Sequence, residues 1–162
     1  VIKSYASKHN SLIVFSHNDL LLGNIIYNAD MKNIKFIDYE YAEINYQAYD
    51  IANHFNEFAG VEEPNYEYFP NKEYQLKWIR VYLESFYSKI KENNLNESFS
   101  IDDTKVEEFY NEVNYFTLAS HLMWAIWSLI QAQNSQLQFN FVRYAQTRFD
   151  EYFKRKHELI KE

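Results

Sequence analysis

The chain of 162 residues contains no cysteine, only two glycines and only two prolines. The absence of cysteine excludes a disulfide framework and a thiolate zinc site. The two glycines, Gly23 and Gly60, stand far apart, so the sequence holds no glycine-rich loop of the kind that cradles phosphates. The length is nevertheless sufficient for one domain with a substantial core.

Basic residues are also scarce. The chain has 16 lysines and arginines against 23 aspartates and glutamates, which gives a net charge of −7. A general nucleic-acid binder needs a basic face to displace counterions, so this balance argues against nucleic acid as a partner. The charge fits a cationic or metal-bridged small substrate, although taken alone it favours the simpler interpretation that an acidic surplus serves solubility.

Long apolar runs are missing as well. No run reaches the roughly 18 residues that a membrane span needs, and no secretory signal is visible. We therefore expect no membrane span and a cytoplasmic protein. The sequence is compatible with an oligomer but does not specify one.

The elements that are present point to a mainly α, α+β fold. Three short apolar runs rich in strand formers, 12–15, 24–27 and 34–37, stand near the start, and the polar stretch 28–33 predicts a hairpin loop. After them the apolar residues recur three or four apart, which is typical of helices. We expect a helix over 51–58 that Gly60 ends, followed by a loop over 61–71. Longer helices are predicted over 73–91, about 103–134 and 137–159, with Asp102 or Asp103 as the cap of the second. The stretch 91–100 is polar and should be exposed.

The predicted strands flank two acidic loops. Asp19 is followed five positions later by Asn24, and Asp38 stands where the third strand ends. This spacing is typical of kinase-type phosphotransferases, in which a loop Asp faces the substrate hydroxyl while an Asn and a second Asp bind the metal. Asn24 and Asp38 offer the oxygen ligands that Mg²⁺ takes. Each residue alone also fits an ordinary turn, but the whole set favours phosphoryl transfer.

Three further residues are candidates for supporting roles. Glu40 is two residues past Asp38, so in an extended segment it would point to the same side and support the metal through water. His17 is a candidate base, but we favour a structural histidine that binds backbone groups, because Asp19 already fills the base position. Asp50 is either the N-cap of the 51–58 helix or a buried carboxylate that braces the Asp19 loop through backbone N–H groups, and the sequence does not decide between them.

These motifs belong to a longer pattern that resembles the choline/ethanolamine kinase family, and most closely its ethanolamine kinase branch. The matching runs extend over most of the chain: His17–Ile26, Phe36–Tyr46, Asp50–Val61, Leu118–His121, Trp124–Ala132 and Tyr144–Phe149. One departure is Tyr144-Ala145-Gln146, which is nearer to the choline branch than to the ethanolamine branch.

The resemblance implies a protein-kinase-like C-terminal lobe with a small β-hairpin at the catalytic edge. It implies transfer of the ATP γ-phosphate to the hydroxyl of ethanolamine, the first step of phosphatidylethanolamine synthesis. Carried over by position, Asp19 would be the catalytic base, and Asn24 and Asp38 would be the Mg²⁺ ligands.

The same resemblance places an amine pocket at Glu57, Trp124, Trp127 and Tyr144. The quaternary ammonium of choline cannot donate hydrogen bonds and suits aromatic rings with one carboxylate, whereas the ammonium of ethanolamine has three donors and needs acceptors as well. Trp124 and Trp127 lie three apart and would share a helix face. Without the resemblance we would assign that pair to the core.

In this family an ATP-covering lobe precedes the catalytic loop, and residues 1–162 contain no such lobe. We therefore expect the chain to be a C-terminal lobe that works with an N-terminal lobe in cis. Two alternatives remain: a choline kinase that makes phosphocholine, and a non-catalytic cation-binding lobe when the chain is separated from its N-terminal lobe.

Overall fold

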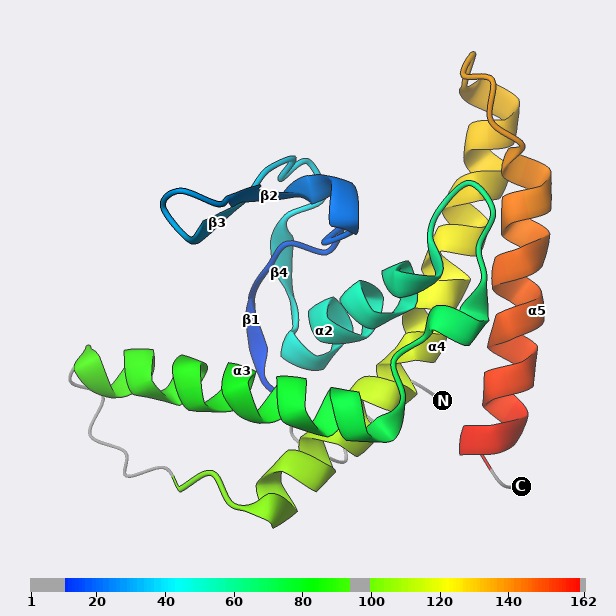
Figure 1. Ribbon diagram of the computed structural model, residues 1–162. Coiled ribbons are helices and arrows are strands. Elements are labelled where there is room, and N and C mark those ends of the chain that lie inside the picture. The colour runs from blue at the N-terminus through cyan, green and yellow to red at the C-terminus, as the bar shows by residue number, and fades with distance from the viewer. Residues whose placement is uncertain (1–10, 94–99, 161–162) are drawn as a thin grey trace. The chain divides into compact units, whose positions relative to one another are not determined.

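A computed structural model of the chain, drawn in Figure 1, describes residues 11–93 and 100–160. The chain divides into two compact units, one within Val1–Phe69 and Val113–Glu162 and the other within Pro70–Glu112. Most of the stretch 91–100, which was expected to be polar and exposed, lies outside the described residues. In the described part no helix is both long and apolar enough to cross a membrane.

The first unit contains two antiparallel strand pairs. Strand β2 (Ile25–Asn28) pairs with β3 (Asn33–Phe36), which confirms the hairpin, and Lys32 in its turn has a positive φ of 48°. Strand β1 (Ile13–Ser16) pairs instead with β4 (Glu43–Tyr46). The sequence did not predict β4, because a four-residue strand with two polar residues carries little local signal and forms through its partner.

Helix α2 (Gln47–Asn56) follows β4 directly. The prediction that Asp50 caps this helix is wrong, because the helix begins three residues before Asp50 and its N-cap, Tyr46, makes no side-chain cap. The Asp50 carboxylate accepts hydrogen bonds from the backbone N–H groups of His17 and Asn18, at 2.9 and 2.8 Å. It therefore braces the loop that carries Asp19, which was the second interpretation. A 3₁₀ turn, η2 (Glu57–Ala59), continues the helix to Gly60, whose φ of 85° ends it.

The long helices were predicted with small errors in their ends. Helix α4 (Asp103–Asn134) is preceded by Asp102, whose carboxylate accepts from the Lys105 N–H at 2.8 Å. Helix α5 (Phe141–Leu159) begins four residues later than expected, because Asn140 supplies the N-cap by accepting from the Arg143 N–H at 3.0 Å.

Helix α5 runs back along the part of α4 that belongs to the first unit (Figure 1). Ser128 on α4 donates to the Phe141 carbonyl at the start of α5. Further along α5, Arg148 donates to Ser120, which lies about two turns before Ser128 on α4. Helix α2 is joined to the same part of α4, because Asn56 donates to the Thr117 carbonyl at 3.2 Å. Three helices thus enclose the buried side chains Phe55, Phe116, Leu118, Ala52 and Ala125.

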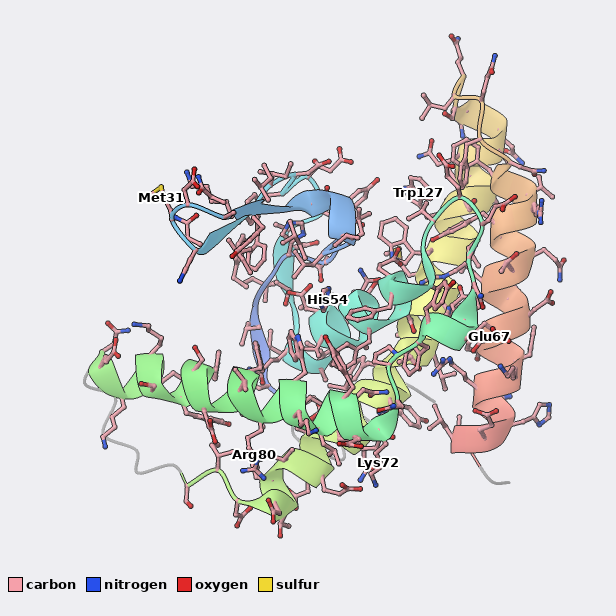
Figure 2. The ribbon with its side chains drawn as sticks, viewed as in Figure 1. Met31, His54, Glu67, Lys72, Arg80 and Trp127 are labelled. Atoms are coloured by element: carbon pink, nitrogen blue, oxygen red, sulfur yellow. The ribbon has the colours of Figure 1, made fainter. Side chains whose placement is uncertain are left out.

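The second unit holds helix α3 (Lys72–Glu92) and the start of α4. Asn71 caps α3 by accepting from the Tyr74 N–H at 2.9 Å. Ile79 and Leu83 are buried on it. Lys72 and Arg80, labelled in Figure 2, form ion pairs with Glu107 and Asp103 respectively. These pairs are largely exposed, so each contributes little to stability.

Candidate active site

The loop that carries Asp19 (residues 17–24, the Asp19 loop) is held by a dense set of hydrogen bonds around Asn18. Asn18 has a left-handed φ of 65°, which Asn adopts more readily than most residues. Its side chain donates to the Tyr41 carbonyl at 3.0 Å and accepts from Asn45 at 2.8 Å. Its own carbonyl accepts from the Asn53 amide at 3.1 Å. Together with the Asp50 brace, these bonds fix the backbone immediately before Asp19.

Asp19 and Asn24 lie together at the base of this loop, and both are buried. The Asn24 Nδ2 donates to the Asp19 carbonyl at 2.8 Å and to its carboxylate at 3.2 Å, which leaves Asn24 Oδ1 as the atom able to bind a cation. Burial, and secondly the charge of Glu57, raise the pKa of Asp19 from 3.8 to about 6. The carboxylate is thus ionised at neutral pH but close to the range in which it takes up a proton.

His17 binds backbone groups with both ring nitrogens. Its Nε2 lies 2.9 Å from the Ile37 carbonyl, and its Nδ1 lies 3.3 Å from the Asp19 N–H. The first contact requires a proton on Nε2 and the second requires a free Nδ1. The ring therefore joins the Asp19 loop to the segment after β3, as the structural interpretation of this residue expects.

Asp38 lies beside the Asp19 loop, because the preceding Ile37 N–H donates to the Asn24 carbonyl at 3.0 Å. Asp38 is exposed and has a left-handed φ of 63°. Glu40 lies in a turn rather than an extended segment. The extended segment on which the Glu40 expectation depended is therefore absent, and support of a metal by Glu40 stays a prediction.

The oxygen atoms of Asn24 and Asp38 fit a Mg²⁺ ion that arrives with a nucleotide. Within residues 11–93 and 100–160, no group of three His, Cys, Asp or Glu side chains forms a metal cage. Mg²⁺ does not require one, because it commonly binds one or two protein oxygens together with phosphates and water. One amide oxygen and one carboxylate match that donor set.

A cavity of about 270 Å³ opens beside Asp19 in the first unit. Its wall is mainly aromatic, and its polar lining includes the carboxylates of Asp19, Glu40 and Glu57; the aromatic residues are Tyr41, Trp124, Trp127, Phe139, Phe141 and Tyr144. We call this cavity the aromatic pocket. It is smaller than the pockets of about 300–1,000 Å³ that hold drug-sized ligands, so it suits a small molecule.

The tryptophans of the pocket are fixed at their polar ends. Trp124 donates from Nε1 to Asn53 Oδ1 at 2.7 Å, and Trp127, labelled in Figure 2, donates from Nε1 to the Tyr41 hydroxyl at 3.0 Å. The two rings meet edge to face, with centroids 5.3 Å apart. Ring faces and carboxylates both attract cations, so the pocket favours a small cationic ligand.

Glu57 carries a partner that the sequence did not reveal. Arg148 Nη1 donates to Glu57 Oε1 at 2.9 Å, and both side chains are almost completely buried. The same Nη1 lies 3.3 Å from the Tyr144 hydroxyl, one helical turn away on α5. The spacing of four from Tyr144 was the only local signal for Arg148.

The structure brings six of the ten predicted site residues into the aromatic pocket: Asp19, Glu40, Glu57, Trp124, Trp127 and Tyr144. Asn24 contacts Asp19 directly, and Asp38, His17 and Asp50 lie next to or against the Asp19 loop. Sequence reasoning missed the pocket residues Tyr41, Phe139 and Phe141, and it missed Arg148 behind Glu57.

The chain is similar to known proteins over almost its whole length. The sequence matches the family model described as choline/ethanolamine kinase over residues 1–153. It is 49% identical over 158 residues to ethanolamine kinase 2 of Rattus norvegicus, which covers 98% of this chain and 38% of that protein. The structure of Plasmodium vivax ethanolamine kinase matches with a TM-score of 0.78 and 34% identity over 93% of this chain and 36% of that one. The structure of Cryptosporidium parvum choline kinase matches with a TM-score of 0.71 and 34% identity over 91% of this chain and 39% of that one. The chain thus spans less than half the length of each of these proteins.

Proposed function

The chain belongs to the choline/ethanolamine kinase family, and we propose that residues 1–162 form the C-terminal lobe of an ethanolamine kinase. The reaction transfers the γ-phosphate of ATP to the hydroxyl of ethanolamine, giving phosphoethanolamine and ADP, as the first step of phosphatidylethanolamine synthesis. The main support is that Asp19 lines the same cavity as the aromatic residues. A bound amino alcohol would thereby present its hydroxyl next to the carboxylate.

The ammonium end of the substrate occupies the aromatic pocket in this proposal. Trp124, Trp127 and Tyr144 offer ring faces to a positive charge. Glu57 offers its second carboxylate oxygen, because the first already accepts from Arg148. A primary ammonium with three N–H donors gains from such an acceptor more than a fully methylated one does.

Asp19 acts on the hydroxyl end. Its carboxylate accepts the hydroxyl proton as the oxygen attacks the γ-phosphate, and its raised pKa, about 6, suits that transfer near neutral pH. Asn24 holds the carboxylate in position through its two hydrogen bonds. Phosphoryl transfer requires mainly such positioning of the nucleophile, together with neutralised phosphate charge.

Asn24 Oδ1 and the Asp38 carboxylate would hold Mg²⁺ in the complete enzyme. When bound, the ion supplies charge neutralisation for the phosphates of ATP. The hydrogen bond from the Ile37 N–H to the Asn24 carbonyl brings the backbone before Asp38 next to Asn24, which supports this assignment.

ATP binding by an N-terminal lobe in cis is part of the proposal. Several large apolar side chains of the strand pairs are exposed, among them Ile13, Phe15, Ile44, Ile26 and Ile34. An exposed apolar surface of this kind is typical of a face that another domain covers. We therefore expect the complete enzyme, meaning this chain joined to an ATP-covering lobe, to be the active form.

Choline is the second candidate substrate. The wall of six aromatic rings suits a quaternary ammonium, and one of the similar structures is described as a choline kinase. We expect choline to be used less well than ethanolamine, because it gains only a charge contact from Glu57.

A steady-state assay tests this proposal against the alternative of a non-catalytic lobe. Phosphoethanolamine formation and ATP binding are measured for residues 1–162 alone and for the complete enzyme. We expect turnover only from the complete enzyme. Steady production by residues 1–162 alone would contradict the need for the second lobe, and no product from either form would contradict the proposed reaction.

A further inference from the structure

A chain of buried hydrogen bonds runs from Glu57 in the aromatic pocket to the backbone of the Asp19 loop. Arg148 donates from Nη1 to Glu57 at 2.9 Å and from Nη2 to Ser120 Oγ at 3.0 Å. Ser120 Oγ donates onward to Asn53 Oδ1 at 2.8 Å. The Asn53 Nδ2 then donates to the Asn18 carbonyl, at 3.1 Å, immediately before Asp19. We call Arg148, Ser120 and Asn53 the buried relay.

The three members come from three different helices. Arg148 lies on α5, Ser120 on α4 and Asn53 on α2, and their exposed fractions are 1%, 0% and 0%. Buried polar groups are costly unless they are paired, so these side chains favour the arrangement in which they bond to one another, with only Arg148 Nε left without a partner among the described residues. The relay therefore fixes α2, α4 and α5 to one another at the pocket.

The orientation of Asn53 is determined by its neighbours. Its Oδ1 accepts from two donors, Ser120 Oγ and Trp124 Nε1 at 2.7 Å. The indole N–H can only donate, so the amide oxygen must face it and the amide nitrogen must face the Asn18 carbonyl. The Asn53 side chain thus holds both the Trp124 indole in the aromatic pocket and the backbone immediately before Asp19.

We propose that Arg148, Ser120 and Asn53 are positioning residues that couple the amine-binding carboxylate to the Asp19 loop. The inference rests on the proposed function, because it assigns Glu57 and Asp19 to the two ends of one substrate. When the ammonium is held at Glu57, the relay keeps the Asp19 carboxylate at the position of the substrate hydroxyl. A displacement of the reacting groups by about 1 Å can cost about a hundredfold in rate, so such a link bears on turnover.

Ser120→Ala in the complete enzyme tests the relay at its middle. It removes one hydroxyl and leaves both the Glu57–Arg148 pair and Asp19 in place. Thr117→Val is the matched control: Thr117 lies one turn earlier on α4 and is equally buried, and its hydroxyl donates within the helix, to the Asn114 carbonyl at 2.6 Å. Each variant thus deletes one buried hydroxyl: Ser120→Ala deletes one that belongs to the relay, and Thr117→Val deletes one that does not.

We expect Ser120→Ala to lower kcat for ethanolamine at least about tenfold with a small change in KM, because the loss falls on the transition state. Thr117→Val should change kcat by less than about threefold. Arg148→Lys keeps a positive charge beside Glu57 but replaces the separate nitrogens Nη1 and Nη2 by one ammonium nitrogen that cannot occupy both positions, so it should resemble Ser120→Ala. Equal kcat values for Ser120→Ala and Thr117→Val would overturn the proposal, whether or not the two variants differ in melting temperature.

A double-mutant cycle that combines Ser120→Ala with Glu57→Gln measures the coupling between the relay and the amine-binding carboxylate. If Glu57 acts through the relay, the fold loss in kcat/KM for the double variant is at least about fivefold smaller than the product of the fold losses for the two single variants. Losses that simply multiply would also overturn the relay.

A second measurement does not depend on turnover. Amide hydrogen exchange in the Asp19 loop should be faster in Ser120→Ala than in Thr117→Val, since only the first removes a bond that holds Asn53 against the Asn18 carbonyl. Equal exchange rates of the Asp19 loop in both variants would overturn the relay. Absence of turnover by the wild-type enzyme with ethanolamine and with choline would instead contradict the proposed function, and the exchange measurement would still decide on the relay.

Discussion

Arg148 and Glu57 form an ion pair at 2.9 Å in which the two side chains are only 1% and 4% exposed. A buried pair of this kind is weak evidence for stability, but removal of one partner leaves an uncompensated charge. The carboxylate that we assign to amine binding is therefore not free. Its orientation is set by α5, and its remaining oxygen is the atom that can reach a substrate.

Glu57→Gln should weaken use of ethanolamine more than use of choline. The variant loses a charge-assisted hydrogen bond to a primary ammonium but only a charge contact to a quaternary one. We expect kcat/KM for ethanolamine to fall by about tenfold or more, with a smaller fall for choline. The melting temperature should also fall, because Arg148 is left without its counter-charge.

Glu40→Gln is the matched control for that change, since Glu40 also lines the aromatic pocket but is exposed. Its melting temperature should stay close to that of the wild type. An equal loss of both substrates in Glu57→Gln would show that Glu57 does not distinguish between them.

Asp19→Asn should abolish most turnover and stabilise the fold. The change preserves the shape and the acceptor for Asn24, so amine KM should change little while kcat falls by orders of magnitude. Burial raises the pKa of Asp19 from 3.8 to about 6, so the ionised group destabilises the folded state as pH rises through that range. We expect the variant to be more stable at pH 8 by up to about 3 kcal/mol, with the difference vanishing below about pH 4.

Denaturant titrations at pH 4 and pH 8, with initial rates, check this prediction. A variant that retains half its kcat would remove Asp19 from the role of base. A variant less stable than the wild type at pH 8 would contradict the raised pKa.

Asp38→Ala should steeply raise the Mg²⁺ concentration needed for activity, because it removes a carboxylate ligand. Asn24→Ala should raise it less, since only a neutral oxygen is lost, but it should also lower kcat through the missing bonds to Asp19. Activity measured against Mg²⁺ at fixed ATP separates the two effects. An unchanged Mg²⁺ titration for Asp38→Ala would place the metal elsewhere.

His121 should make the fold sensitive to acid. Its side chain is fully buried, neither ring nitrogen has a hydrogen-bond partner among the described residues, and its ring meets Tyr66 edge to face at 5.3 Å. Burial first, then the charges of Arg148 and Arg155, hold the pKa of His121 well below 6.5. Below about pH 6.5 the unfolded chain therefore binds a proton that the folded chain does not, so stability falls as pH decreases.

His121→Leu should remove that part of the pH dependence. Between pH 7 and pH 5 we expect the wild type to lose up to about 2 kcal/mol more than the variant. His54, whose pKa burial also lowers, is present in both proteins and cancels in the comparison. Parallel loss of stability in the two proteins over this range would show that His121 is not the titrating group.

The parts of the site that could be predicted from sequence are those fixed by short spacing. Asp19, Asn24 and Asp38 fall on loops beside short strands, so local rules placed them. Trp124 and Trp127 were placed by the family resemblance, because local rules alone assigned that pair to the core. The role of Asp50 could not be decided, because its partners His17 and Asn18 are more than thirty residues upstream. A helix cap and a distant brace leave the same local pattern.

The residues that were missed depend on how helices pack. Arg148 reaches Glu57 only because α5 runs back along α4, and Tyr41 enters the pocket because β4 returns the chain to β1. The start of α5 was placed too early for a related reason: the helix begins where Asn140 caps it, and the apolar residues before that point line the pocket. Periodicity reports an apolar face but not which surface it meets.

Competition among ethanolamine, its monomethyl and dimethyl analogues, and choline tests the central claim most directly. The complete enzyme is given ATP, Mg²⁺ and all four amines, and the phosphorylated products are quantified together. The account predicts a graded preference, with kcat/KM for ethanolamine at least about tenfold above that for choline, or about 1.4 kcal/mol. Equal or better use of choline would contradict an ethanolamine kinase, and phosphorylation of none of the four would contradict the assignment of the aromatic pocket to an amino alcohol.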